Sequence, residues 1–152
     1  MKGELRVNHD KLLADGWSPL PSSAFASVIG TTYARRVEGA WEVGMIASEI
    51  ALNEGLGIVH GGALTTFADV AFGFVVARTL GVVNCVTTQL QFQFTAPALA
   101  GSYITCRPEI VRRTSQLVFV RGLFEANGRV VGSADAIFMM MADDKMGSLR
   151  GG

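Results

Sequence analysis

One stretch decides the fold of this chain: Asn53-Glu-Gly-Leu-Gly-Ile-Val-His-Gly-Gly-Ala-Leu-Thr-Thr-Phe-Ala-Asp69-Val-Ala-Phe-Gly-Phe-Val-Val76. It opens with a glycine-rich segment and continues as a long apolar run that a single carboxylate, Asp69, interrupts. A helix that is apolar on nearly every side has to be buried, and a glycine can end it in the left-handed conformation. The stretch therefore predicts a buried central helix from about Gly62 to Thr79 that stops at Gly81.

The segments on both sides of this helix have the patterns of strands. Thr87–Thr95 alternates strictly, with Leu90, Phe92 and Phe94 on one side and glutamines on the other. Asn127-Gly128 is a strong signal of a tight hairpin. Six strands are expected, and they are Thr32–Val37, Trp41–Ser48, Thr87–Thr95, Ser102–Val111, Gln116–Ala126 and Arg129–Ala142.

The N-terminal segment carries weaker signals than the rest of the chain. His9–Asp15 and Ser22–Ile29 predict two short helices, with Ser22 as the N-cap of the second and Gly30 as its stop. Trp17–Pro21 predicts a loop, because its two prolines disfavour regular structure.

The order of these elements predicts the architecture. Two strands, one long apolar helix and four strands in hairpin succession favour an α+β fold, in which an antiparallel sheet of five to six strands wraps a central helix. The chain has 152 residues, of which 49% are hydrophobic and 17% charged, so it can bury a sizeable core. We expect one domain over residues 1–142 and a flexible polar tail over residues 143–152.

Charge and cysteine content exclude several function classes. The net charge is zero, which gives no reason to expect a nucleic acid or a membrane surface as partner. Cys85 and Cys106 lack the spacing of a metal or redox site, so no metal is predicted. Residues 1–6 lack the apolar core of a signal peptide, and a cytoplasmic location is expected.

Asp69 is the first candidate for chemistry. Thr65, Asp69 and Gly73 are spaced by four, so they form one stripe of the helix. A carboxylate on such a helix costs several kcal/mol unless it is hydrogen-bonded or paired. Two interpretations stay open: a structural aspartate that accepts bonds from nearby hydroxyls, and a catalytic acid or base.

The start of the helix is the second candidate. Gly61 and Gly62 offer unpaired backbone N–H groups at the positive end of the helix dipole, and without side chains they let a substrate oxygen approach closely. That is the design of an oxyanion hole. The glycines could also simply make the turn into the helix, and His60 taken alone is more often structural than catalytic.

The distance between the two candidates has a consequence for assembly. Gly62 and Asp69 share a helix face but lie ~10 Å apart along the axis. A reacting atom has to sit ~3 Å from both the oxyanion donor and the base or nucleophile. If both groups are catalytic, the site needs two helices, so the active protein is at least a dimer in which Asp69 of one subunit faces Gly61 and Gly62 of the other.

These residues resemble a known family, the hot-dog fold acyl-CoA thioesterases of the PaaI type. The resemblance rests on His60-Gly61-Gly62, on Asp69, and on the glutamine-rich strand that ends in Phe94-Thr-Ala-Pro-Ala98, and it covers about residues 25–141. It implies a long helix wrapped by an antiparallel sheet. It also implies a homodimer or homotetramer with its active sites at the subunit interface.

The resemblance implies hydrolysis of an acyl-CoA thioester with an aromatic or medium-length acyl group. The N–H of Gly62 or Gly61 would polarise the thioester carbonyl, and Asp69 would act across the interface as general base or nucleophile. Thr87 would help to orient the water, and His60 would hydrogen-bond near the thioester or hold the loop. Coenzyme A is part of the substrate in this interpretation, so no cofactor is expected.

One position departs from the family pattern. The family has an asparagine six residues before the histidine of His60-Gly61-Gly62, and here that position is Glu54, with Asn53 one residue earlier. An asparagine amide can donate a hydrogen bond, whereas an ionised glutamate cannot. Either the loop shifts so that Asn53 reaches the site, or Glu54 takes another role, for instance as a second carboxylate.

The sequence gives weaker signals for the residues that would contact the phosphates of coenzyme A and the acyl group. Arg112 and Arg113, in a predicted exposed turn over residues 112–115, are candidates for the phosphates of coenzyme A, although a solvated charged turn is the stronger interpretation for either arginine taken singly. The acyl pocket is predicted from helix and loop residues, among them Leu56, Phe72 and Val76.

Two alternatives to a thioesterase remain at this point. A hot-dog hydratase or dehydratase needs a histidine and an acid at the substrate, and the chain has only His9 and His60. A non-catalytic protein that binds or senses acyl-CoA is the other alternative, which the Glu54 departure keeps open.

Overall fold

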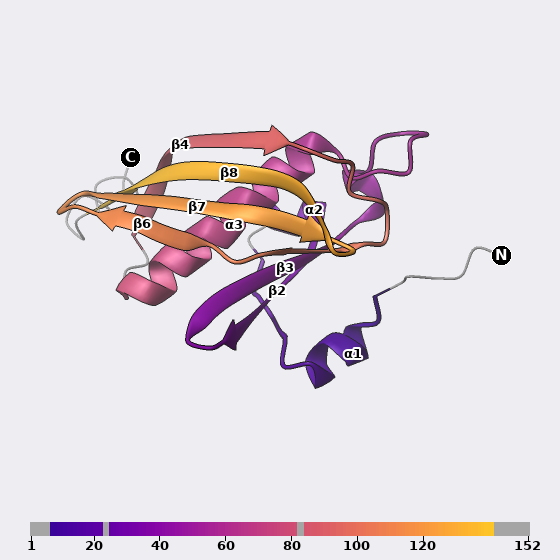
Figure 1. Cartoon of the computed structure of the whole chain (residues 1–152), viewed down its shortest axis with the longest axis horizontal. Coiled ribbons are helices and arrows are strands. Elements are labelled where there is room, and N and C mark those ends of the chain that lie inside the picture. The colour runs from indigo at the N-terminus through magenta and orange to yellow at the C-terminus, as the bar shows by residue number, and fades with distance from the viewer. Residues whose placement is uncertain (1–6, 23–24, 82–83, 142–152) are drawn as a thin grey trace.

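The long apolar helix lies at the centre of the fold. The computed structural model describes residues 7–22, 25–81 and 84–141. Figure 1 shows α3 (Gly61–Leu80) lying across one face of a curved antiparallel sheet, as the sequence predicts. The helix begins one residue earlier than expected, and Gly81 ends it with a φ of 65°.

The sheet has eight strands among the described residues, more than the five to six expected. Their order is β1-β2-β3-β5-β7-β8-β4, and β6 pairs beside β7. The strand bounds are β1 Ser18–Pro19, β2 Gly30–Val37, β3 Ala40–Ala47, β4 Cys85–Phe94, β5 Tyr103–Cys106, β6 Glu109–Arg113, β7 Leu117–Ala126 and β8 Arg129–Met140. Every pairing is antiparallel.

Two local differences account for the extra strands. The predicted loop over residues 17–21 contains the two-residue strand β1, which pairs with Tyr33 and Ala34 of β2. The single strand predicted over residues 102–111 is divided into β5 and β6, because Pro108 has no N–H to donate to a ladder.

The shorter helices follow the prediction in part. Helix α1 (His9–Ala14) begins after Asn8, whose side chain accepts the N–H of Asp10. Helix α2 is only Ala26–Ile29, with Phe25 in the N-cap position and no side-chain cap, so the assignment of Ser22 as its cap is wrong. The short 3-10 helix η1 (Glu49–Ala51) was not predicted. The predicted tail over residues 143–152 lies outside the described residues.

The core explains why α3 is so apolar. Phe67 and Phe72 are fully buried, and both rings contact the ring of Phe124 on β7, with centroid distances of 5.6 and 5.9 Å. The helix is long and apolar enough to span a membrane by length and composition. Its burial against the sheet provides a sufficient reason for that composition.

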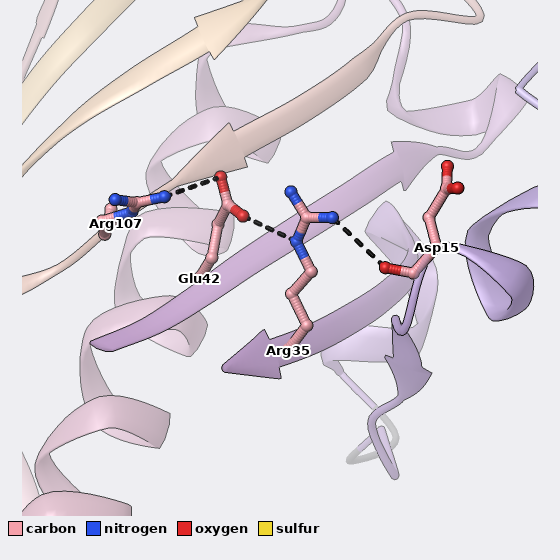
Figure 2. A network of polar contacts seen from close by, with 4 residues as sticks. All are labelled: Asp15, Arg35, Glu42 and Arg107. Atoms are coloured by element: carbon pink, nitrogen blue, oxygen red, sulfur yellow. Dashed lines mark hydrogen bonds and ion pairs between the residues drawn. The ribbon is translucent and has the colours of Figure 1, made fainter. Parts of the chain in front are cut away.

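A second, smaller core holds the N-terminal segment on the opposite face of the sheet. Leu12, Trp17 and Tyr33 are buried there together. Figure 2 shows the polar contacts beside them: Arg35 donates to Glu42 at 2.7 Å and to the backbone oxygen of Asp15 at 3.3 Å. The Arg35 guanidinium also lies 4.4 Å from the centre of the Trp17 ring. These contacts fix the N-terminal segment away from α3.

Strand β4 forms one edge of the sheet. It pairs with β8 and has no other strand partner within residues 7–22, 25–81 and 84–141. Leu90 and Phe92 pack against the core, while Gln89, Gln91 and Gln93 are exposed, which confirms the predicted alternation. An open edge beside the central helix is a surface that a second chain can extend.

Candidate active site

Among the described residues, the first turn of α3 carries a single donor without a partner. The first four N–H groups of a helix have no partner inside it. Here His60 donates to the Ala51 oxygen at 2.8 Å, Gly62 to Nδ1 of His60 at 2.8 Å, and Ala63 to the His60 oxygen at 2.9 Å. Only the N–H of Gly61 finds no partner in the part of the chain that the structure describes.

Two aromatic rings lie against the two glycines at the start of α3. A Cβ on Gly62 would lie 3.0 Å from Nδ1 of His60. A Cβ on Gly61 would lie 3.1 Å from the ring of Phe94, at the end of β4. The His60 ring therefore covers Gly62, and the Phe94 ring covers Gly61.

A pocket of about 370 Å³ opens beside Gly61. Its walls are mostly apolar, and Asn53 is a polar loop residue among them. The lining residues are Asn53, Ile58, Val59, Gly61, Leu64, Phe94, Thr95, Ala96, Pro97 and Ala98. Glu54 is absent from this lining and lies exposed in the turn before Gly55. The structure thus brings Asn53 to the helix start and leaves Glu54 outside.

Asp69 is held by one hydroxyl from the neighbouring strand. Thr87 donates through Oγ1 to Oδ1 of Asp69 at 2.5 Å. The helix hydroxyls do not reach the carboxylate, because Thr65 and Thr66 donate to the oxygens of Gly61 and Gly62. Among the described residues no cation pairs with Asp69, and its Oδ2 has no hydrogen-bond donor.

The helix face around Asp69 is half-open. Thr65, Asp69 and Gly73 lie four residues apart on the continuous helix α3, which confirms that they share one stripe, and all three are partly exposed. Burial, followed by the charge of Asp69, raises the pKa of the nearby Cys85 thiol. That thiol is therefore protonated near neutral pH and is a poor nucleophile. The carboxylate is the reactive group that this stripe offers.

A larger hollow exists elsewhere on the molecule. It has a volume of about 730 Å³ and lies over β5, β7 and β8 on the face away from α3. Charged residues dominate its lining, and Arg121 and Glu109 pair there at 3.0 Å. None of the predicted site residues lines it. The smaller pocket is the candidate site, because it alone of the two touches the unpaired Gly61 donor.

Comparisons with known proteins match this arrangement. The model of the Thioesterase superfamily matches residues 56–133, which include the start of α3, Asp69 and Thr87. The chain belongs to the thioesterase superfamily. Its central helix and antiparallel sheet are the hot-dog fold of that superfamily.

Three relatives illustrate the similarity. A candidate thioesterase of Ralstonia eutropha, a phenylacetic acid degradation-related protein, is 30% identical, with a TM-score of 0.68 over 88% of this chain and 100% of its own. A Bacillus halodurans protein solved with CoA is 26% identical, with a TM-score of 0.65 over 72% of this chain and 74% of its own. A candidate esterase of Pseudomonas aeruginosa is 27% identical over 127 residues, covering 82% of this chain and 94% of its own.

Gly61 and Asp69 of this superfamily member do not meet within one chain. They are eight residues apart on α3, which is about 12 Å along the axis. The separation predicted from the sequence therefore holds in the folded chain, and a shared site still requires a second copy.

The arginines proposed for coenzyme A lie in a strand rather than in a turn. Arg112 and Arg113 belong to β6, and the turn itself begins at Thr114, whose N–H donates to the Leu117 oxygen. Arg113 pairs with Val118, Val118 with Phe138, and Phe138 with Thr87. Arg113 is therefore in the same cross-strand row as Thr87, at three strand spacings or about 14 Å.

The predicted acyl-pocket residues are partly wrong. Phe72 and Val76 have no exposed surface and form the core, so they cannot contact a ligand. Leu56 is 68% exposed on the loop. Phe94 was missed as a site residue, although the alternation of β4 already placed it on the inner face. The missing information was which inward residue of that strand reaches the helix start.

Proposed function

We propose that this protein hydrolyses acyl-CoA thioesters to a free acid and coenzyme A. One observation carries the proposal: the unpaired N–H of Gly61 opens beside a mostly apolar pocket at the positive end of α3. Membership in the thioesterase superfamily supports this reaction class. The CoA in the Bacillus halodurans relative supports the choice of thiol carrier.

Gly61 would stabilise the charge that develops on the thioester oxygen. When a nucleophile attacks the carbonyl carbon, the oxygen becomes negative, and a fixed backbone donor is worth most at that moment. The helix dipole adds a partial positive charge at the same place. Of the two glycines that the sequence left open, Gly61 is favoured, because His60 already accepts the N–H of Gly62.

Asp69 of a second subunit would supply the base or the nucleophile. As a base, it takes a proton from water while the water oxygen attacks the carbonyl carbon; the C–S bond then breaks and the CoA thiolate is protonated. As a nucleophile, it attacks the carbonyl carbon, the C–S bond breaks and the CoA thiolate leaves and is protonated, and water then hydrolyses the resulting mixed anhydride to the free acid and the carboxylate. In either role Thr87 holds Oδ1 and leaves Oδ2 free to react.

The acyl group would lie in the pocket beside Gly61. The ring of Phe94 and the side chains of Ile58 and Leu64 suit an aromatic or medium-length acyl group. Asn53 can donate its amide to the carbonyl or to the water, which is the role that the family pattern gives to an asparagine in this loop.

A dimer would complete the site. Strand β4 has an open edge within the described part of the chain, and the α3 stripe that carries Asp69 is half-open beside it. A second copy placed along this edge would bring a second α3 close to the first, so that each pair of helices forms two sites. The 12 Å that separates Gly61 from Asp69 on one helix is the reason to expect this, at about 1.5 Å per residue.

A hydratase or dehydratase is disfavoured by the positions of the two histidines. His9 lies on α1, on the far face of the sheet, within hydrogen-bond distance of the Tyr33 hydroxyl at 2.9 Å. His60 uses Nδ1 to cap α3. His9 is therefore remote from Asp69, and the Gly62 N–H already occupies the ring nitrogen of His60 that accepts hydrogen bonds, so neither histidine offers an unoccupied basic nitrogen beside Asp69.

A thiol-release assay tests the proposed function. Purified protein is given a panel of acetyl-, hexanoyl-, decanoyl-, benzoyl- and phenylacetyl-CoA, and free CoA is followed by a colorimetric thiol reagent. We expect turnover of at least one ester, and Asp69→Asn should lower kcat by roughly 10²–10⁴. Saturable binding of these esters without thiol release would instead identify a non-catalytic acyl-CoA-binding protein.

A further inference from the structure

Histidine is an unusual residue for the start of a helix. Side chains that cap helix N-termini are usually serine, threonine, aspartate or asparagine. Here His60 has the extended backbone of an N-cap, with φ −63° and ψ 138°, and its Nδ1 accepts the N–H of Gly62 at 2.8 Å. The ring is otherwise exposed. The cap is therefore made by an uncharged aromatic acceptor.

We propose that His60 is a positioning residue, whose neutral cap on Gly62 aims the neighbouring Gly61 N–H at the substrate. This inference rests on the proposed function, because it concerns the same oxyanion donor. It assigns His60 no contact with the reacting atoms. Its effect passes through the backbone of two consecutive glycines.

The contacts around the two glycines show how the aim is fixed. Glycine has more backbone freedom than any other residue, so a Gly-Gly pair needs external restraints to hold one geometry. The hydroxyls of Thr65 and Thr66 donate to the backbone oxygens of Gly61 and Gly62. The Gly62 N–H donates to Nδ1 of His60. The His60 cap is the contact that restrains the N–H groups of the pair. Without it, the backbone at Gly61 could rotate, and the Gly61 N–H beside the pocket would lose its fixed direction.

The neutrality of the cap matters as much as its geometry. An aspartate at this position would cap the helix equally well and would also favour the helix dipole. Its negative charge, however, would lie next to Gly61, the residue that donates to the substrate oxygen. That oxygen becomes negative in the reaction, and like charges at short range repel strongly. A neutral imidazole satisfies Gly62 without that repulsion, provided that the proton is on Nε2.

Four substitutions separate a positioning role from a structural one: His60→Ala, His60→Asn, His60→Ser and His60→Asp. Alanine removes the cap, asparagine and serine restore a neutral cap, and aspartate restores a charged cap. For each variant kcat and KM are measured with the best ester of the panel, and Tm is measured by calorimetry. The wild-type imidazole tautomer is read by ¹⁵N NMR at neutral pH.

The expected pattern is a separation of kcat from stability. His60→Ala should lower kcat on the order of 10- to 100-fold with little change in KM, since misplaced donors act on the transition state. His60→Asn and His60→Ser should recover most of this loss. His60→Asp should recover Tm fully and yet have a kcat at or below that of His60→Ala. The NMR spectrum should show the Nε2–H tautomer.

Several results would overturn the inference. Equal kcat values in the aspartate and asparagine variants would exclude the charge effect. An asparagine variant with wild-type Tm and the kcat of His60→Ala would mean that the imidazole itself acts on the substrate. An Nδ1–H tautomer would exclude the cap. A wild-type protein that releases no thiol would refute the proposed function and with it the positioning role, whereas Tm and the tautomer report on the cap independently of turnover.

Discussion

Two polar regions of this molecule differ in how completely their charged side chains and helix-end groups are paired, although the Tyr103 hydroxyl beside the first region is buried with no hydrogen-bond partner among the described residues. Around Arg35, on the face of the sheet away from α3, the guanidinium donates to Glu42 and to the Asp15 oxygen and stacks on Trp17. Arg107 approaches the second oxygen of Glu42 at 4.0 Å. At α3, by contrast, the Gly61 N–H and Oδ2 of Asp69 have no partner among the residues described.

The difference separates groups that hold structure from groups that are available for a ligand. Buried or half-buried polar groups in folded proteins nearly always have partners, so each unpaired one needs an explanation. The Arg35 cluster stabilises the attachment of the N-terminal segment. The unpaired groups at α3 are one donor, the Gly61 N–H, and one acceptor, Oδ2 of Asp69, and thioester hydrolysis requires one group of each kind. Substitutions in the two regions should therefore affect different properties.

The largest of the next three effects is expected at Thr87. Thr87→Val removes the hydroxyl that holds Asp69 and should lower kcat roughly tenfold, which corresponds to losing one hydrogen bond to a charged group. Thr88→Val is the matched control, because Thr88 donates to the Ile137 oxygen on the same strand and not to Asp69. Equal kcat losses in the two variants would mean that Thr87 acts only through the strand.

A change in acyl preference is expected from Phe94. Phe94→Ala enlarges the pocket beside Gly61, so the kcat/KM ratio of decanoyl-CoA to hexanoyl-CoA should rise by several-fold, which is below the roughly 10- to 200-fold that one methylene contributes in a closed hydrophobic pocket. Leu99→Ala is the control, since Leu99 is similarly exposed but does not line the pocket. An unchanged ratio in Phe94→Ala would place the acyl group elsewhere.

The smallest effect is expected in the paired region, and on stability alone. Glu42→Gln weakens the pair with Arg35, whose side chains are 15% and 30% exposed. Solvent screening limits the loss in unfolding free energy to about 0.5–1 kcal/mol. Glu109→Gln breaks a pair that is 61% and 58% exposed and should change stability even less. Urea unfolding measures the unfolding free energy of both variants. A fall in kcat for Glu42→Gln would contradict the prediction that this region affects stability alone.

The sequence predicted the features that depend on local pattern. The long apolar run of α3, the stop at Gly81, the spacing by four of Thr65, Asp69 and Gly73, and the alternation of β4 are each visible in short windows, and the structure confirms them. The spacing of Gly62 and Asp69 on one helix was equally readable, because helix geometry fixes it.

The features that failed depend on contacts between distant segments. No local signal indicated that Phe94 lies on Gly61 or that Ser18–Pro19 pairs with β2, since both contacts join segments far apart in the sequence. Phe72 and Val76 were assigned to a pocket because an apolar helix does not reveal which side faces the core. The role of His60 as a cap was missed because histidine is uncommon at that position.

The central claim is that the Gly61 N–H is the oxyanion donor, and one pair of substitutions tests it directly. Proline is favoured at the first position of a helix, where its missing N–H costs no helix hydrogen bond, and the extended backbone of His60 is compatible with a following proline. Gly61→Pro therefore deletes this one donor within an intact fold. Gly61→Ala places the same Cβ against Phe94 and keeps the N–H.

The measurement is the thiol-release kcat of Gly61→Pro relative to Gly61→Ala, with Tm recorded for both. We predict that the proline variant is roughly 10²–10³-fold slower than the alanine variant, the cost of removing one oxyanion donor. Its Tm should equal or exceed that of the alanine variant, since proline restricts the unfolded chain. Equal kcat values in two folded variants would contradict the claim.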